Sequence, residues 1–415
     1  MRSTPAARCG GCWTGRCRGG SLALALRGSF PKLDDAAFAD GAARLVDLQR
    51  RFWDGAAPAA GATPDRQWLV LTPNHLSGGN SGGTLVNQVA VLHVPQDFSV
   101  GSSTFEFLVA HENLHQWFPR RFGVHGGGQS GPDDNEQRDV PHYWFSEGFT
   151  DHYSYRLLLA SGLWSLDHYA DQLTQRARAY LGSPARHLGA GQIAARFFSD
   201  REAGRQMYLR GELLALHWDA ALRRAGRGTL TQLLQGLLLP AAGADEDDSA
   251  RKQTAASERV LAALSLALAG SGVQPREEIE RYVMRGELLP VGMADTSWTA
   301  DELSPCLRPE IERVHRWELG FDRESFRTRV LQGVDPGGPA HGAGLRDGMA
   351  LAGFSVYGGD ISRDVQLWIK DEGKDKKPLL VSYRPVSREA LPMPRWRARE
   401  GALDDAACRA WISGS

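Results

Sequence analysis

The stretch FLVAHENLHQWFPRRFG, from Phe107 to Gly123, carries two histidines four residues apart, with a glutamate directly after the first. On an α-helix, His111 and His115 lie on one face, one turn apart, so that two imidazole nitrogens can converge on one tetrahedral zinc ion. Glu112 points in an adjacent direction, where it can take a proton from an activated water. The alternative is a core helix with two incidental histidines, because so short a pattern also occurs by chance.

A catalytic zinc site needs a third protein ligand. One class of zinc peptidases places a histidine six residues after the second one, where this chain has Arg121, and a glycine where it has Phe118, so that class is excluded. Another class takes a glutamate from a following helix, and YWFSEGFTDHYSYRLL supplies Glu147. Ser146 is expected to cap that helix, and Asp151 can accept a hydrogen bond from a zinc-bound imidazole. The helix dipole alone would favour an acidic residue at the helix start, but it does not explain this pairing of carboxylates one turn apart.

Length and composition set broad limits. The chain has 415 residues, enough for two or three domains with their own cores. Lys and Arg number 48 against 49 Asp and Glu, which argues against nucleic-acid binding. No run reaches the roughly 18 apolar residues that a membrane span needs, so no transmembrane segment is predicted. Residues 1–21 are predicted to be a disordered tail without a convincing signal peptide, and an extracytoplasmic location is favoured only if the N-terminus is truncated.

Five cysteines are present. Cys9, Cys12 and Cys17 resemble half a zinc knuckle, but no second pair follows at the right spacing, so we predict no metal site there. Cys306 and Cys408 flank the C-terminal module. They can form a disulfide in an oxidising compartment, although sequence spacing cannot establish the pairing.

The chain before the metal stretch predicts an α/β entry region over residues 22–100. Residues 34–53 have apolar side chains at helical spacing behind an acidic cap. The runs QWLVLTPN (67–74) and TLVNQVAVLHVP (84–95) each predict one strand, with a glycine-rich turn between them. Helical spacing over residues 102–118 places the two histidines on a helix.

The remainder divides into a helical part and a small β-rich part. Residues 101–299 complete a domain that spans 22–299, and the pattern from Tyr143 to about Trp298 is almost wholly helical. Glycines, prolines and short β-rich runs then return, which predicts a separate domain over 300–396 and a C-terminal tail over 397–415.

Three motifs, HENLHQW, WFSEGFTDHYSY and MYLRGELLALHWD, together resemble the glycyl-aminopeptidase family of zinc metallopeptidases. The resemblance covers roughly residues 22–396. It implies a multidomain α+β fold, in which a short β-region precedes a mainly helical, thermolysin-like (gluzincin) catalytic domain and a small β-rich PDZ domain follows. Family members usually begin with a large β-rich domain, and the chain ahead of the zinc helix is too short to hold one, so we expect that domain to be lost or the reading frame to be truncated.

The resemblance also implies the roles of individual residues. One Zn²⁺ is expected to be held by His111, His115 and Glu147, with Glu112 as the general base. Tyr208, in the family's Y-x-R/K-G motif, is expected to donate a hydrogen bond to the tetrahedral oxyanion. The alternative for Tyr208 is an aromatic side chain in a helix interface.

The C-terminal part carries a second resemblance. WELGF, followed by VLQGVDPGGPAHGAGLRDGM, resembles a PDZ domain. This implies that backbone N–H groups of Leu319, Gly320 and Phe321 hold a peptide C-terminus. Met349 stands where an aspartate is usual, and a packing or substrate-presenting role is the alternative.

The substrate-contacting strand departs from the family. Members carry G-G-L-E-H ahead of the zinc helix, and its glutamate meets the free α-amine of the substrate. This chain has SGGTLVNQVAVLH, which keeps Gly82 and Gly83 as expected substrate contacts but has no acidic residue. Asn87 can accept a hydrogen bond but carries no charge, so a cationic amine bound there would lose water without gaining an ion partner.

These features predict a zinc-dependent metallopeptidase, aminopeptidase-like, that hydrolyses peptide or protein substrates by metal-activated water. The alternative is a catalytically degenerate scaffold that binds peptides through its PDZ domain. A decayed site should lose ligands, so the intact ligand set argues against the scaffold. No sequence feature favours a related hydrolase with a non-peptide substrate.

Overall fold

The chain divides into two compact units. Unit 1 comprises Met1–Pro309 and Trp396–Ser415, and unit 2 comprises Glu310–Arg395, so unit 2 is inserted between two segments of unit 1. The computed structural model describes residues 7–9, 12–17, 20–55, 66–74, 81–86, 88–95, 103–122, 139–239, 249–291, 306–370, 377–399 and 405–414.

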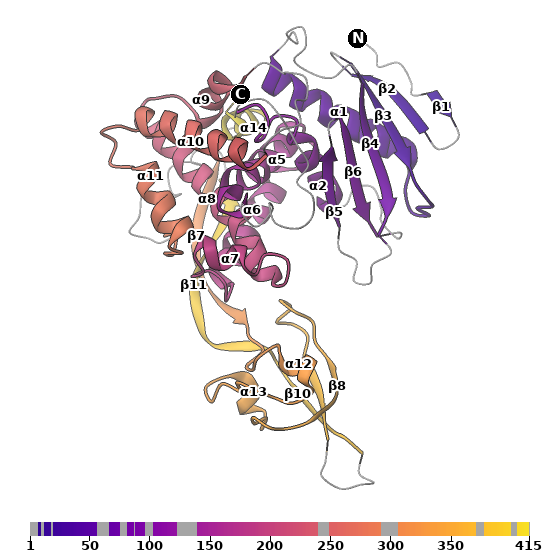
Figure 1. Ribbon diagram of the computed structural model, residues 1–415, viewed down its shortest axis with the longest axis vertical. Helices are drawn as coiled ribbons and strands as arrows, with labels where there is room; N and C mark the ends of the chain where they lie inside the picture. Colours follow the sequence, from indigo (N-terminus) through magenta and orange to yellow (C-terminus); the bar gives the residue numbers. More distant parts are fainter. Residues whose placement is uncertain are drawn as a thin grey trace. The chain divides into compact units, whose positions relative to one another are not determined.

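Unit 1 begins with a six-stranded sheet (Figure 1) in the order β1-β2-β3-β4-β6-β5. Strand β3 pairs in parallel with β4, and β4 pairs in parallel with β6, while the outer pairs are antiparallel. The strands are β1 (Ala7–Cys9), β2 (Cys12–Cys17), β3 (Gly20–Leu26), β4 (Arg66–Pro73), β5 (Gly82–Val86) and β6 (Val89–Val94).

Two parts of this sheet differ from what the sequence predicts. The run 84–95, expected as one strand, forms an antiparallel hairpin in which Thr84 pairs with Val91, and its turn includes Gln88. The polar residues Asn87 and Gln88 interrupt the apolar run between the two strands, a break that the prediction of one strand does not use. Strands β1 and β2 occupy part of the first 21 residues, for which the sequence predicts a disordered tail.

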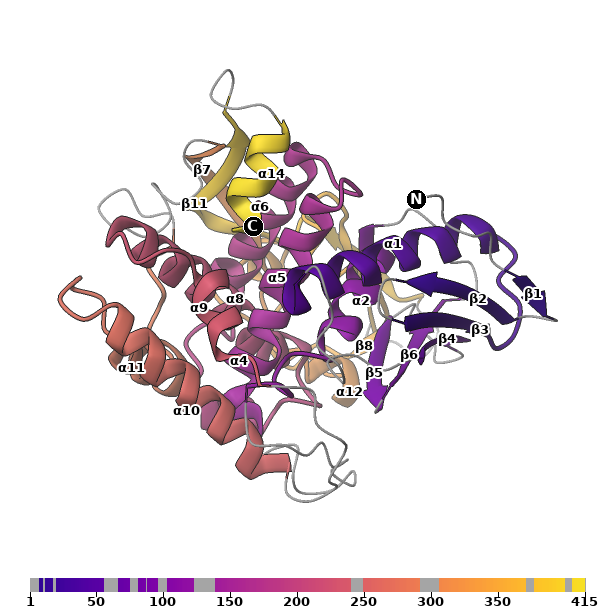
Figure 2. The ribbon, with the colours of Figure 1, turned by 90° about the horizontal axis from the view of Figure 1, so that it is seen from above.

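Helices α1 (Asp35–Asp54) and α2 (Ser103–Leu114) pack against the sheet and against each other (Figure 2). The predicted acidic cap of α1 is present: a carboxylate oxygen of Asp34 accepts from the N–H groups of Ala36 and Ala37, each at 3.0 Å. Helix α2 carries His111 and Glu112, and His115 follows directly after its last residue, Leu114, although the sequence predicts a helix that continues to residue 118. The sheet and α1 therefore form one side of the support for the two histidines.

The described residues from 139 to 291 are mainly helical, as the sequence predicts. Helix α5 is central, since every side chain from Gly148 to Leu159 is buried. It packs against α2 and α8. The elements are η1 (Val140–His142), α4 (Tyr143–Ser146), α5 (Gly148–Ala160), α6 (Leu166–Gly182), α7 (Ala190–Ala194), α8 (Arg201–Arg224), α9 (Leu230–Leu237), α10 (Ser249–Ala267), α11 (Pro275–Glu278) and the π-helical turn η2 (Ile279–Met284). Within the ranges that the structure describes, no helix has both the length and the apolar character of a membrane span.

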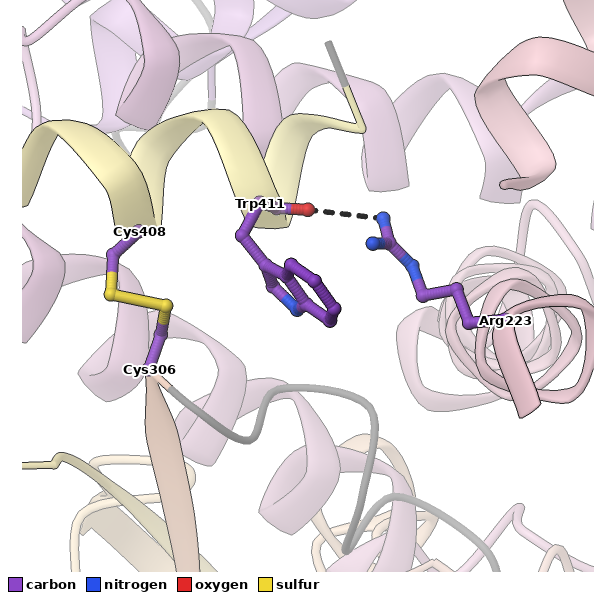
Figure 3. Close-up of a disulfide and its surroundings, with 4 residues drawn as sticks. All are labelled: Arg223, Cys306, Cys408 and Trp411. Atoms are coloured by element: carbon purple, nitrogen blue, oxygen red, sulfur yellow. Dashed lines mark hydrogen bonds between the residues drawn. A yellow bond between two sulfur atoms is a disulfide. The ribbon is translucent and has the colours of Figure 1, made fainter. Parts of the chain in front are cut away.

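Helix α14 (Asp405–Ser413) returns to unit 1 and packs on α5 and α6, although the sequence predicts a tail there. A disulfide joins Cys408 of this helix to Cys306 (Figure 3), so the pairing that sequence spacing cannot establish is present. Arg223 of α8 donates to the carbonyl oxygen of Trp411 at 3.0 Å, and its guanidinium lies 4.9 Å from the centroid of that indole ring. These contacts make α14 an integral part of unit 1.

Unit 2 has its own apolar core, which includes Leu331, Leu345 and Leu367. Strands β7 (Leu307–Trp317) and β11 (Val386–Ala398) form a two-stranded sheet and carry the chain into and out of unit 2, which also holds a three-stranded sheet in the order β10-β9-β8 and two short helices. These are β8 (Leu351–Ser355), β9 (Val365–Ile369), β10 (Leu379–Tyr383), α12 (Ser325–Thr328) and α13 (Pro339–Gly342).

The loop from Leu319 to Phe321 lies against this core. Both end residues are buried, and the carbonyl oxygen of Leu319 accepts from the Tyr383 hydroxyl at 2.6 Å. Gly320 has φ +81°, and a Cβ there would lie 2.9 Å from Ala340. Both the backbone conformation and the close packing therefore require glycine at this position.

Candidate metal centre

Three side chains, from α2, from the residue that follows α2 and from the α4–α5 junction, meet at one point. The Nε2 atom of His111 lies 3.2 Å from Nε2 of His115 and 3.2 Å from Oε2 of Glu147, and the His115 Nε2 lies 3.6 Å from the same oxygen. The sequence predicts these three residues as metal ligands, and the structure brings them together.

This triangle has the dimensions of a zinc site. Zinc–nitrogen and zinc–oxygen bonds of about 2.0–2.2 Å in a tetrahedron put neighbouring ligand atoms about 3.3–3.5 Å apart. The observed separations of 3.2, 3.2 and 3.6 Å bracket that value. A small cation with tetrahedral coordination would therefore fit between the three atoms, and such a cation takes one further ligand.

In each imidazole the Nδ1 atom makes a hydrogen bond, which leaves Nε2 as the nitrogen that can bind a metal. The Nδ1 atom of His115 is 3.0 Å from the carbonyl oxygen of Phe118, which can only accept, so Nδ1 carries the proton. The Nδ1 atom of His111 is 2.8 Å from Oδ1 of Asp151, as the sequence predicts for an orienting carboxylate. In the neutral rings both Nε2 atoms then present lone pairs to each other and to Glu147, an arrangement that a cation stabilises.

Asp151 is ionised in this setting. Burial alone would raise the pKa of Asp151, but the Arg176 guanidinium beside it and the hydrogen bond with His111 hold that pKa below its usual range. A charged carboxylate is the stronger acceptor for an imidazole N–H.

Glu147 does not sit where capping by Ser146 would place it. Helix α4 continues into α5 through Glu147, whose φ and ψ of −105° and −47° are in the helical region. The buried Ser146 hydroxyl has no hydrogen-bond partner among the described residues, while the Ser146 carbonyl accepts from Thr150 Oγ1 at 2.6 Å. The predicted serine cap is wrong because the chain is already helical at this point and offers the hydroxyl no free N–H.

Glu112 lies between the metal ligands and strand β5. Its side chain is buried, and that burial raises the pKa of the carboxyl. A Cβ built on Gly83 would lie 2.5 Å from Cγ and Cδ of Glu112, whereas one on Gly82 would meet nothing within 4 Å. The backbone of β5 can approach the carboxylate this closely only with glycine at position 83. Asn87, also predicted to contact substrate, lies outside the described residues.

Tyr208 of α8 lies on the other side of the site. Its ring is stacked on that of His111, with centroids 6.4 Å apart, and it is 6.5 Å from the ring of Tyr143. Burial, with the charges of Glu147 and Asp151, raises the pKa of Tyr208 well above its usual value. The phenol therefore keeps its proton and can donate a hydrogen bond.

Two glycines let α8 approach α4 and the start of α5, beside the predicted metal ligand Glu147. A Cβ on Gly211 would lie 1.9 Å from the carbonyl oxygen of Trp144, and a Cβ on Gly148 would lie 2.5 Å from Cα of Gly211. The two backbones are in direct contact at this crossing. Gly211 is the glycine of the YLRG motif, in which the sequence suggests a role for the tyrosine alone.

Hydrogen bonds from buried side-chain amides fix the position of α2. Gln49 of α1 donates to the carbonyl oxygen of Ala110 at 2.8 Å, and Asn113 hydrogen-bonds with both Gln49 and Gln67. Asn113 is one of the two variable positions between the histidines, where the sequence suggests only an uncharged residue suited to a core. The network instead ties the histidine helix to α1 and β4.

Arg176 of α6 is a contact of the site that the sequence does not reveal. Its side chain forms ion pairs with Asp151 and Glu212 and donates to the Tyr155 hydroxyl at 2.8 Å. Arg176 lies 25 residues after Asp151, in a helix with an ordinary amphipathic pattern, so only tertiary structure identifies it.

Comparisons with known proteins agree with this picture. Residues 104–203 match the model of the M61 glycyl aminopeptidase family, a segment that includes His111, His115 and Glu147 but ends before Tyr208. The chain is similar to the crystal structure of an aminopeptidase N family protein from Idiomarina loihiensis, with a TM-score of 0.59 and 13% identity over 96% of this chain and 70% of that one. No curated protein matches the sequence. The chain thus has an aminopeptidase-like fold, and its match to the M61 family supports a peptidase function.

Proposed function

We propose that the protein is a zinc-dependent metallopeptidase of the gluzincin type, with one zinc ion held by His111, His115 and Glu147. The observation that carries this proposal is the ligand triangle of 3.2, 3.2 and 3.6 Å between atoms whose ring partners leave both Nε2 lone pairs free. When bound, the zinc supplies Lewis-acid activation of a water and of the substrate carbonyl.

Different residues of the chain move the proton and stabilise the developing negative charge. Glu112 takes a proton from the attacking water and delivers it to the leaving amine. Tyr208, kept protonated by burial, donates to the oxygen on which negative charge develops. Asp151 holds the ring of His111 in one orientation.

The position of β5 supports an extended peptide as the substrate. Within the described sheet β5 is an edge strand, paired only with β6, and Gly83 brings its backbone against Glu112. An exposed strand edge offers N–H and C=O groups that can pair with a peptide backbone. Gly82, where a Cβ would meet no described atom within 4 Å, would leave room for that peptide.

The chain offers fewer contacts for the ends of a peptide substrate than for its backbone. In β5 the sequence GGTLV has no carboxylate to meet a free α-amine. We therefore propose aminopeptidase-like cleavage with a weaker requirement for a charged N-terminus. Unit 2 would act as a PDZ domain, with Leu319, Gly320 and Phe321 receiving a peptide C-terminus. The Cys306–Cys408 disulfide supports an oxidising, extracytoplasmic location.

Metal analysis and cleavage assays test the proposal together. We expect about one zinc per chain, and we expect a chelator to abolish cleavage of a peptide library that added zinc then restores. Libraries with free and with acetylated N-termini should differ less than for an enzyme that binds the amine through a carboxylate. Cleavage that survives complete removal of the metal would contradict the proposal.

Replacing Gly83 with alanine is expected to lower kcat/KM by at least about tenfold while leaving the zinc content unchanged. The new methyl group would lie 2.5 Å from the Glu112 side chain and displace it. Gly191→Ala is the control, because Gly191 lies in α7, outside the proposed site, and a Cβ there would meet no described atom within 4 Å. Equal activity of the two variants would show that β5 does not set the position of Glu112.

Tyr208→Phe is expected to lower kcat by about 10²-fold, with a smaller change in KM. The ring keeps its packing against His111 and Tyr143, while the donor to the oxyanion is lost. Steady-state kinetics on a peptide substrate measure the effect. An unchanged kcat would assign Tyr208 to the helix interface only.

A further inference from the structure

Resting on this proposed function, we propose that Arg176 is a positioning residue that couples the metal centre to the helix carrying Tyr208. It touches neither the predicted ligands nor the place of the substrate in the described contacts. It acts through Asp151 on one side and Glu212 on the other.

All three nitrogens of the Arg176 guanidinium make a hydrogen bond or an ion pair. Its Nη2 donates to Oδ2 of Asp151 at 2.5 Å, its Nη1 donates to the Tyr155 hydroxyl at 2.8 Å, and its Nε pairs with Oε2 of Glu212. The three partners lie on α5 and α8, and Arg176 itself lies on α6. One planar group therefore fixes three helices with respect to each other.

On the α5 side, Arg176 determines how Asp151 faces the metal centre. Asp151 gives one oxygen to His111 Nδ1, at 2.8 Å, and the other to Arg176. With both oxygens held, the carboxylate plane cannot rotate. Arg176 therefore controls the orientation of the His111 ring indirectly, through Asp151. The direction of the Nε2 lone pair follows from that orientation.

On the α8 side, Glu212 lies one helical turn after Tyr208, and residues four apart share a helix face. The ion pair with Arg176 consequently fixes how α8 is rotated about its axis and shifted along it at the turn that carries Tyr208. On α5, Asp151 bears the same one-turn relation to Glu147. The same guanidinium therefore sets the metal-ligand helix against the oxyanion-donor helix.

Because the side chains of Arg176, Asp151 and Glu212 are buried together, the position requires arginine. The side chains of Arg176, Asp151 and Glu212 are 12%, 5% and 6% exposed. Removing the cation would leave two buried carboxylates without a counter-charge. A lysine keeps the charge but has a single ammonium group, which cannot satisfy partners on both helices in one plane.

The experiment compares the full-length wild-type protein with Arg176→Lys and Glu212→Gln. Zinc affinity is measured by chelator competition on metal-free protein, and site geometry by the visible absorption of the cobalt-substituted protein. We expect Arg176→Lys to weaken zinc binding about 10- to 100-fold and to change the cobalt bands, with kcat reduced more than KM is raised. Glu212→Gln keeps the tie to Asp151, so its zinc affinity and cobalt bands should stay near those of wild type while kcat falls.

Arg178→Lys is the matched control, since Arg178 lies two residues along the same helix and points about 200° away from Arg176. Wild-type cobalt bands and zinc affinity in Arg176→Lys would overturn the positioning role. The same changes in Arg178→Lys would also overturn it, because they would reflect loss of any arginine on α6. A wild-type protein that binds zinc but cleaves no peptide would contradict the proposed function alone, and one that binds no zinc would contradict both.

Discussion

Glu112→Gln is expected to reduce kcat for peptide hydrolysis by about 10²- to 10⁴-fold while the bound zinc stays at the wild-type level. Glutamine has nearly the same shape as glutamate but cannot accept the proton of the attacking water. The buried position of Glu112, against Gly83 and beside the ligand triangle, makes replacement by a bulk water inefficient. Kinetics with a good library substrate, together with metal analysis, measure both quantities.

Glu106→Gln provides the matched control for this variant. Glu106 lies on the same helix and accepts a hydrogen bond from Trp164 Nε1 at 2.8 Å, a bond that the amide oxygen of glutamine can keep. Its kcat should stay close to that of wild type. A Glu112→Gln variant that is as active as this control would rule out Glu112 as the general base.

Gly211→Ala is expected to lower the free energy of unfolding by about 3 kcal/mol or more and to remove most activity. The added methyl group would lie 1.9 Å from the carbonyl oxygen of Trp144, a backbone atom that cannot rotate away. Helix α8 must then move from α4 and α5, and Tyr208, less than one turn before Gly211, must move from His111. Denaturant unfolding and peptide kinetics would show the two effects together.

Gly236→Ala is the control for the helix-propensity part of that change. Gly236 lies in α9, and a Cβ there would meet nothing within 4 Å. We expect it to raise the free energy of unfolding by up to about 1 kcal/mol, since alanine favours a helix over glycine. If Gly211→Ala instead stabilised the protein as Gly236→Ala does, the close helix crossing would not constrain the fold.

The sequence predicts the residues of the metal centre because local periodicity determines most of their geometry. Residues four apart on a helix must share a face, so helical spacing alone pairs His111 with His115 and Glu147 with Asp151. That the two pairs meet is a tertiary fact, but it follows once α2 and α5 pack together. The hairpin over 84–95 could have been predicted from the same local pattern, because the polar residues Asn87 and Gln88 interrupt the apolar run at the place where β5 gives way to β6.

Arg176 and Gly211 mark the limit of such prediction. An arginine on an amphipathic helix is ordinarily a solvent-facing residue, and only the arrangement of α5, α6 and α8 buries this one between two carboxylates. The glycine within α8 would ordinarily be a weak point of the helix. The contact that explains it is with Trp144, in a different helix far back along the chain, and no local pattern reveals such a contact.

Helix α14 gives the order of synthesis a structural consequence. The ribosome must produce all of Glu310–Arg395 before it produces the segment that contains Cys408 and α14. Until then α5, the helix that follows Glu147, lacks the neighbour that packs along it in the finished protein. Because domains generally fold as their chains emerge, unit 2 can fold first, and the peptidase unit reaches its final form only afterwards. Closure of the Cys306–Cys408 disulfide therefore comes last, after the chain has been made through Cys408.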